Sequence, residues 1–167
     1  MNRNITNTRR LHGARRRLND FLEACSVLGD KLGLFLVGLS PAFKKDLERF
    51  DEFLSILPEQ RSVFEFRHSS WFDDEVFARF RGQRELTLAM LGSQFDNNVE
   101  CFTDFAHIRW HARGRNGDGY SPSELDSWAR RIREISQRAD VFGYWNNDAH
   151  GYAPQNCLQL TRKPASL

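Results

Sequence analysis

The sequence predicts an α/β fold in which about five parallel strands alternate with helices that cover the sheet from outside. Three observations predict this class. Short apolar runs alternate with stretches of helical apolar spacing, the connections between the runs are too long for hairpins, and the 167 residues, 40% of them hydrophobic, are enough for one core. Since the composition is even along the chain, we expect one domain over residues 1–167.

The first elements follow from the spacing of the apolar residues. Spacings of three and four over residues 15–31 predict a helix with one buried face. The short apolar run over residues 34–37 predicts a strand that is covered on both faces. Helical spacing returns over residues 43–57 and ends at Pro58, because proline cannot continue a helix.

The middle of the chain repeats this alternation. Residues 62–66 predict a second strand, and Asp73 can cap a short helix behind it. Residues 86–91 predict a third strand, which a polar loop through Asn97 and Asn98 follows.

The last part of the chain adds two strands and two helices. Residues 105–110 and 141–145 predict the strands. Between them, residues 121–124 form a Ser-Pro-Ser-Glu capping box with proline at the first helical position, which predicts the start of a helix. A final helix is predicted over about residues 152–160. The buried stripe of the helix that the capping box opens is expected to contain Leu125, Trp128, Ile132 and Ile135.

Composition and cysteine usage narrow the class of protein. No window approaches the roughly 18 consecutive apolar residues of a membrane-spanning helix, and no signal-peptide core follows the Arg-rich start. We therefore expect a cytoplasmic protein with no membrane partner. Because Cys25, Cys101 and Cys157 are odd in number and far apart, we expect them to be reduced and buried.

The first 14 residues are expected to form a basic arm. Six arginines precede Asp20, the first acidic residue of the chain. Such an arm can hold phosphates by releasing counterions. No aromatic residue is interleaved there to stack on bases, so we favour a solvated helix face and do not expect a nucleic-acid partner.

Five blocks of sequence, in order, resemble the YecE-like family (domain of unknown function 72). Residues 65–72, EFRHSSWF, resemble the family segment EFRHPSWF, and residues 144–156 resemble its closing segment YFNND..GYA..NA. The other blocks are residues 28–33, residues 41–44, and residues 103–105 with 108–111.

The resemblance implies a (β/α) barrel of the TIM type, of which this chain would be a part. Residues 5–7 with 9–11 resemble the stretch that follows the family's third strand, so the first three βα units are expected to be absent. A closed barrel of this type usually needs about 200 residues or more. Five strands cannot close, and the first and last strands would then present open edges.

The chain departs from the family pattern at four positions. Gly38 stands where Gln is usual, Gly92 where Asp is usual, His107 where Tyr is usual and Ala112 where Gly is usual. Two predicted strand ends thereby lack a polar side chain.

Polar side chains at the strand ends are the candidates for a site, since a (β/α) barrel places its site there. Glu65 and Arg67 share one face of a strand, and His107, Arg109 and His111 share one face of another. A buried glutamate is costly unless it is paired. We expect either that Glu65 and Arg109 form a buried ion pair, or that Glu65 is a base while Arg109 clamps an anionic ligand.

Two further groups have alternative interpretations. Asn147 or Asp148 could cap the final helix, or Asn146 and Asp148 could line a polyol or phosphate site. His68 and Trp71 could position and cover a ligand, or they could belong to the core.

Neither a metal nor a cofactor is expected. His107 and His111 lie four positions apart on one strand, roughly 13 Å at about 3.3 Å per residue, which is too far for both to hold one ion. The basic, glycine-rich residues 111–119 match no nucleotide-binding motif.

The leading hypothesis is a barrel-mouth site for a small anionic or sugar-like ligand with acid–base chemistry, although the residues select no reaction. The alternative is a non-catalytic protein that binds a partner chain or a second copy of itself, or an inert fragment of a split or truncated barrel. In the leading hypothesis Glu65, His111 and Asp148 are catalytic, and Arg67, His68, Trp71, Arg109, Asn146 and Asn147 bind the ligand.

Overall fold

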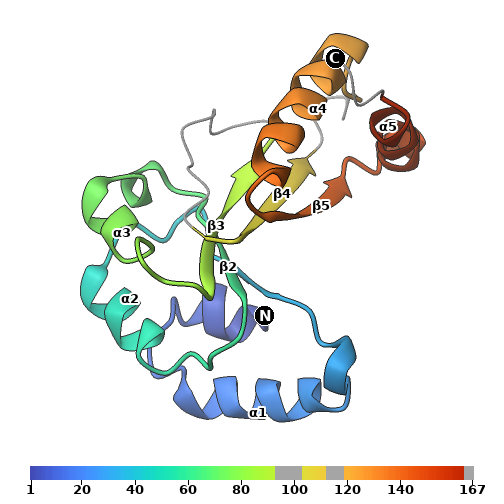
Figure 1. Cartoon of the computed structure of the whole chain (residues 1–167). Coiled ribbons are helices and arrows are strands. Elements are labelled where there is room, and N and C mark those ends of the chain that lie inside the picture. Colours follow the sequence, from blue (N-terminus) through green and yellow to red (C-terminus); the bar gives the residue numbers. More distant parts are fainter. Residues whose placement is uncertain (93–102, 112–118, 164–167) are drawn as a thin grey trace. The chain divides into compact units, whose positions relative to one another are not determined.

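The computed structural model describes residues 1–92, 103–111 and 119–163. Five parallel strands form a sheet with the order β1-β2-β3-β4-β5 (Figure 1), so the expected α/β class is confirmed. The chain divides into two compact units, residues 1–88 and 89–167. The division falls within β3 (Leu86–Leu91), whose first three residues pair with β2 and whose last three pair with β4.

The first unit alternates helices with two complete strands. Its elements are η1 (Asn4–Thr8), α1 (Arg15–Ser26), η2 (Gly29–Lys31), β1 (Phe35–Gly38), α2 (Leu47–Leu54), β2 (Ser62–Glu65), η3 (Ser69–Trp71) and α3 (Asp74–Ala78).

Helix α2 is shorter than predicted, because an N-cap side chain fixes where it begins. The helix predicted over residues 43–57 begins only at Leu47, since Asp46 has an extended backbone and its carboxylate accepts a hydrogen bond from the Arg49 backbone N–H at 3.1 Å. Asp73 caps α3 in the same way, as predicted. The helices α2 and α3 lie side by side (Figure 1), and both Nε and Nη2 of Arg79 donate to the Asp51 carboxylate at 2.7 Å.

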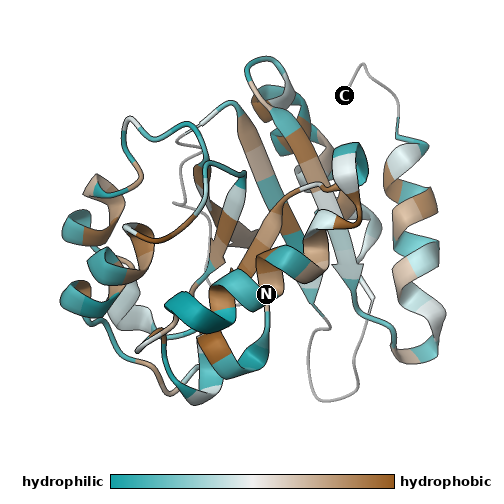
Figure 2. Cartoon of the chain, turned by 90° about the horizontal axis from the view of Figure 1, so that it is seen from below, coloured by the Kyte–Doolittle hydropathy of each residue, from teal (hydrophilic) through white to brown (hydrophobic). Residues whose placement is uncertain are grey.

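The core of the first unit is an aromatic cluster. Phe50 is fully buried and meets the rings of Phe64, Phe66 and Trp71 edge-on, with centroid distances of 5.2–5.8 Å. The rings of Phe66 and Trp71 stack at 4.9 Å. Edge-to-face aromatic packing adds to the stabilisation from burial, so this cluster fixes how α2 lies on β2. Figure 2 shows the hydrophobic residues concentrated on the strands.

The expected basic arm is anchored by its apolar residues. Ile5, Leu11 and Ala14 are buried, and the Met1 ammonium group donates to the Leu36 carbonyl oxygen in β1 at 2.8 Å. Burial lowers the pKa of that ammonium group. Most of the arginines of the segment remain exposed, so the segment packs through one side and presents cations on the other.

The second unit contains the end of β3 and all later elements. The Ser121–Glu124 capping box forms as predicted, because the side chain of each residue bonds the backbone N–H of the other. The predicted polar loop at Asn97 and Asn98 lies outside the described residues. The remaining elements are β4 (Phe105–His111), α4 (Pro122–Ser136), β5 (Asp140–Asn146), η4 (Ala149–Gly151) and α5 (Tyr152–Thr161).

Trp110 organises the core of the second unit. Its ring stacks on Trp145 at 4.3 Å and meets Trp128 edge-on at 5.4 Å. Two glycines make room for it: a Cβ atom at Gly143 would lie 2.7 Å from the Trp110 ring, and one at Gly92 would lie 2.8 Å from it. The glycine at position 92 therefore accompanies close packing, since the Cβ of an aspartate would also lie 2.6 Å from the Tyr120 hydroxyl oxygen and would displace both aromatic side chains.

The prediction that the cysteines are buried is wrong for the two that the structure describes. Cys25 and Cys157 are free and half-buried. Cys25 lies on α1, a helix in which Leu18 alone is buried. Cys101 lies outside the described residues.

Of the helices in the described ranges, none has the length and apolar character to cross a membrane.

Candidate functional site

The carboxyl ends of β4 and β5 bring polar side chains together on one face. In the parallel register, Arg109 lies opposite Tyr144 and His111 lies opposite Asn146. Nη2 of Arg109 donates to Oδ1 of Asn146 at 3.4 Å, and Nδ2 of Asn146 lies 3.4 Å from Nδ1 of His111. One asparagine therefore links the arginine and the histidine, which share a strand face as expected from their spacing.

His107 lies at the buried end of this strand face. It is 2% exposed, and its ring stacks on the ring of Tyr144 with a centroid distance of 4.9 Å. Tyr144 itself is 48% exposed, so the stack extends from the buried part of the strand to the surface. We call the five residues His107, Arg109, His111, Tyr144 and Asn146 the β4–β5 cluster.

The β4–β5 cluster has the composition of a binding surface for polar ligands. The Arg109 guanidinium group carries a fixed positive charge and can donate two parallel hydrogen bonds to a carboxylate or phosphate. The Asn146 amide and the Tyr144 hydroxyl group can both donate and accept, which suits hydroxyl groups of a ligand. Two histidines add ring nitrogens that can donate or accept hydrogen bonds.

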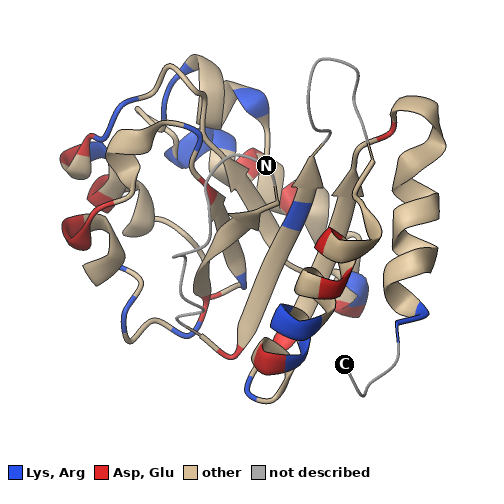
Figure 3. Cartoon of the chain, turned by 90° about the horizontal axis from the view of Figure 1, so that it is seen from above, with Lys and Arg blue, Asp and Glu red and all other residues tan. Residues whose placement is uncertain are grey.

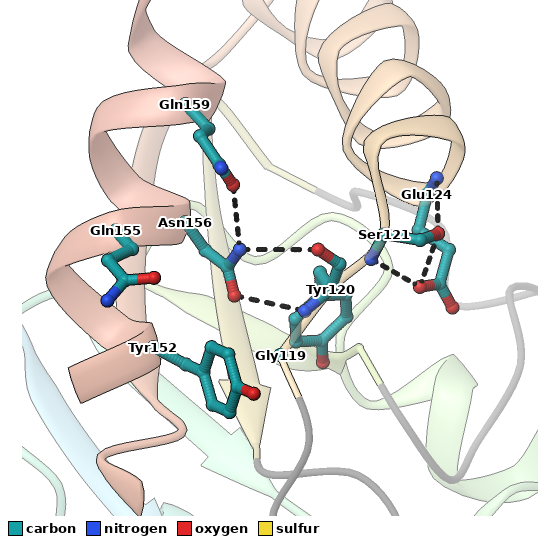
Figure 4. A pocket seen from close by; sticks show the side chains of 8 residues that line it. All are labelled: Gly119, Tyr120, Ser121, Glu124, Tyr152, Gln155, Asn156 and Gln159. Carbon is teal, nitrogen blue, oxygen red and sulfur yellow. Dashed lines mark hydrogen bonds between the residues drawn. The ribbon is translucent and has the colours of Figure 1, made fainter. Parts of the chain in front are cut away.

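The residues that follow β5 stabilise the fold through buried hydrogen bonds. Asn147 is fully buried, and its Nδ2 donates to Oδ1 of Asn156 in α5 at 2.9 Å. The same Asn156 oxygen accepts the Tyr120 backbone N–H at 3.0 Å, while Nδ2 of Asn156 donates to the Tyr120 carbonyl oxygen at 3.3 Å and to Oε1 of Gln159 at 3.0 Å (Figure 4). Asn156 thus ties the end of β5 and α5 to the segment before α4.

The prediction that Asn147 or Asp148 caps the final helix is wrong. The helix α5 begins after Gly151, which has a left-handed backbone and makes no side-chain cap. Asp148 is exposed and stands before η4 without a side-chain cap hydrogen bond. Asn156, which sequence reasoning noted only within a family block, is the residue that secures this corner. Its place three residues after the buried Ala153 is the available sequence signal of an inward face.

A hollow of about 300 Å³ opens beside this network (Figure 4). Its single acidic lining residue, Glu124, bonds both the backbone N–H and the hydroxyl group of Ser121 at 2.8 Å as part of the capping box. The hollow is lined by Gly119, Tyr120, Ser121, Glu124, Tyr152, Gln155, Asn156 and Gln159.

In the first unit, Glu65 forms a buried ion pair at the end of β2. The side chain of Glu65 is fully buried, and Nε and Nη2 of Arg67 both lie 2.6 Å from its Oε1. Arg67 is 42% exposed, so its guanidinium group also faces solvent. Such a pair compensates the cost of burying a carboxylate. The predicted pair of Glu65 with Arg109 stays a prediction.

His68 and Trp71 follow the ion pair and differ in burial. His68 is half-buried, and its Nδ1 accepts the Ser70 backbone N–H at 3.2 Å, which leaves Nε2 to carry the ring proton. Trp71 is fully buried, and its Nε1 donates to the Phe43 carbonyl oxygen at 2.7 Å. These contacts support the core interpretation for Trp71.

Within the described ranges, no three His, Cys, Asp or Glu side chains gather as metal ligands would.

Comparison with known proteins agrees with the resemblance in sequence. The family described as "Protein of unknown function DUF72" matches residues 1–166. A DUF72 family protein of Thermotoga maritima is similar in structure, with a TM-score of 0.86 and 22% identity over 96% of this chain and 70% of that chain. No curated protein matches.

A second structure, of a DUF72 family protein from Enterococcus faecalis, has a TM-score of 0.74 and 19% identity over 93% of this chain and 71% of that chain. At these identities the likeness concerns the fold. The family match extends over all five strands of the sheet. The chain therefore belongs to the DUF72 family of proteins of unknown function.

Proposed function

We propose that the β4–β5 cluster binds a small anionic or sugar-like ligand. The observation that supports this proposal most directly is the linkage of Arg109, Asn146 and His111 through two contacts of 3.4 Å at the carboxyl ends of adjacent parallel strands. At 3.4 Å these hydrogen bonds are long, so a ligand oxygen can replace them at little cost. Arg109 would hold the anionic group, and Asn146 with Tyr144 would bond hydroxyl groups.

Acid–base chemistry at this surface is the finer part of the proposal. His111 is proposed as the group that transfers the proton, because its contact with Asn146 through Nδ1 leaves Nε2 for this role. Asp148 is proposed as a further acid–base group of the second unit, and Glu65 as an acid–base group within the first unit. For Glu65, that role requires Arg67 to release the carboxylate. In the first unit, we propose ligand binding by Arg67 and His68. In the second unit, Asn147 would position the ligand indirectly, by fixing Asn146.

Binding of simple probes tests this proposal. We would titrate the chain with inorganic phosphate and with glucose by isothermal titration calorimetry and compare Arg109→Lys with the parent. Lysine keeps the charge but loses the bidentate geometry, so phosphate affinity at this site should fall about tenfold. Arg138→Lys is the matched control, since Arg138 is exposed outside the cluster. Equal affinity in the parent and in Arg109→Lys contradicts the proposal.

The second candidate function is binding of a partner strand through β5. Among the described residues β5 pairs only with β4, and all seven of its residues are exposed or half-buried. An unpaired strand edge offers backbone donors and acceptors to another chain. The partner would be a second copy of this chain or a chain that supplies further barrel strands. Sedimentation velocity at increasing protein concentration tests self-association, and a monomer at every concentration contradicts it.

A further inference from the structure

We infer that the first unit contains a separate binding site for a small phosphate-bearing molecule. The site is a hollow of about 490 Å³ between the segment after η1 and the first turn of α2. We call it the basic hollow. It is lined by Thr8, Arg9, Arg10, His12 and Arg49.

The charges of the basic hollow are largely uncompensated. Arg49 has an acidic partner, because its Nε lies 3.1 Å from the Asp46 carboxylate. Within the described parts of the chain, neither Arg9 nor Arg10 forms an ion pair. Among the described residues, two guanidinium groups therefore have no anionic partner, beside a third that is paired with the half-buried Asp46 carboxylate. Figure 3 shows Lys and Arg segments, together with Asp and Glu segments, near the end marked N.

The turn that carries these arginines has an unfavourable backbone conformation. Arg10 and Leu11 have positive φ angles of 46° and 70°, although neither is glycine. Such a backbone is unfavourable for residues other than glycine and persists where surrounding contacts enforce it, often at ligand-binding sites. Leu11 supplies these contacts, since its side chain is 2% exposed and its N–H donates to the Ile5 carbonyl oxygen at 2.9 Å.

The lining of the basic hollow selects the class of ligand. Three guanidinium groups and the Thr8 hydroxyl group match the charge and the several oxygens of a phosphomonoester. No aromatic residue lines the hollow, so bases would find no stacking surface and a nucleic acid is not the expected ligand.

The test compares two arginine variants of the whole chain, with inorganic phosphate and glycerol 2-phosphate as probes. Arg10→Gly removes one guanidinium group and also relieves the positive φ. We expect its melting temperature to stay level or rise while its affinity for both probes falls roughly tenfold. Arg16→Gln is the control, since Arg16 is exposed on α1 and does not line the hollow.

Three results would overturn the inference. One is the absence of phosphate binding in a chain whose single substitution is Arg109→Lys, because this substitution leaves the basic hollow intact. Another is an equal loss of affinity in Arg10→Gly and Arg16→Gln, which indicates a diffuse cationic surface. The third is tighter binding of a single-stranded oligonucleotide than of glycerol 2-phosphate, with equal dependence on both arginines.

Discussion

Replacement of Asn156 by alanine should destabilise the second unit more than any neighbouring surface change. Asn156 is 3% exposed, and its side chain makes four hydrogen bonds. The variant leaves two buried donors, the Tyr120 backbone N–H and the Asn147 amide, without their acceptor. An unsatisfied buried donor costs about 1–3 kcal/mol, so the free energy of unfolding should fall by about 3 kcal/mol.

The size of this loss makes it easy to measure. In a chain of this length, about 3 kcal/mol corresponds to a decrease in melting temperature of about 6–12 °C. Near-ultraviolet circular dichroism follows it through the stacked Trp110 and Trp145. Gln155→Ala is the matched control, because Gln155 is exposed and lines the same hollow. A loss below about 0.5 kcal/mol in Asn156→Ala would refute the role assigned to this network.

Three further predictions concern packing and charge. Phe50→Ala should lower the free energy of unfolding by about 3–5 kcal/mol, measured by urea denaturation, because a fully buried ring is lost. Gly92→Asp should lower the melting temperature, because the new Cβ meets Trp110; an unchanged melt would contradict this packing. The hydrogen bond from Lys45 lowers the pKa of Asp73, so its stabilisation holds above pH 3.8 and disappears as the pH falls further; Asp73→Asn should flatten this part of an acid denaturation curve.

Much of the fold could be predicted because the signals were local. The strand at residues 86–91 and the capping box at residues 121–124 agree with the structure residue by residue, since an apolar run and a cap each depend on a few adjacent side chains. Helix lengths were less predictable. Asp46 delays the start of the predicted helix to Leu47, because its side chain accepts the backbone N–H of Arg49 as an N-cap.

The candidate site was predictable only in part. Spacing along β4 correctly put Arg109 and His111 on one face, but the partner that links them, Asn146, comes from another strand. The parallel register that brings Asn146 there is a tertiary property. Similarly, the Glu65–Arg67 pair uses two residues of one face that were noted together, yet the partner proposed for Glu65 was a more distant arginine.

The basic hollow was beyond prediction from sequence for a different reason. Its six-arginine neighbourhood was evident, but an unbroken basic segment gives no sign of a turn with positive φ at Arg10 and Leu11. Neither residue type favours that conformation. Burial of Leu11 enforces the turn, and this burial depends on the packing of the unit.

Binding at the β4–β5 cluster is tested most directly by a nuclear magnetic resonance titration that observes backbone amides together with the side-chain N–H groups of Arg109 and Asn146. Inorganic phosphate and glucose would be added separately. We predict saturable shifts at Arg109, His111, Tyr144 and Asn146, and loss of the phosphate-dependent shifts in Arg109→Lys. Resonances of the cluster that do not move with either probe would contradict the proposed function.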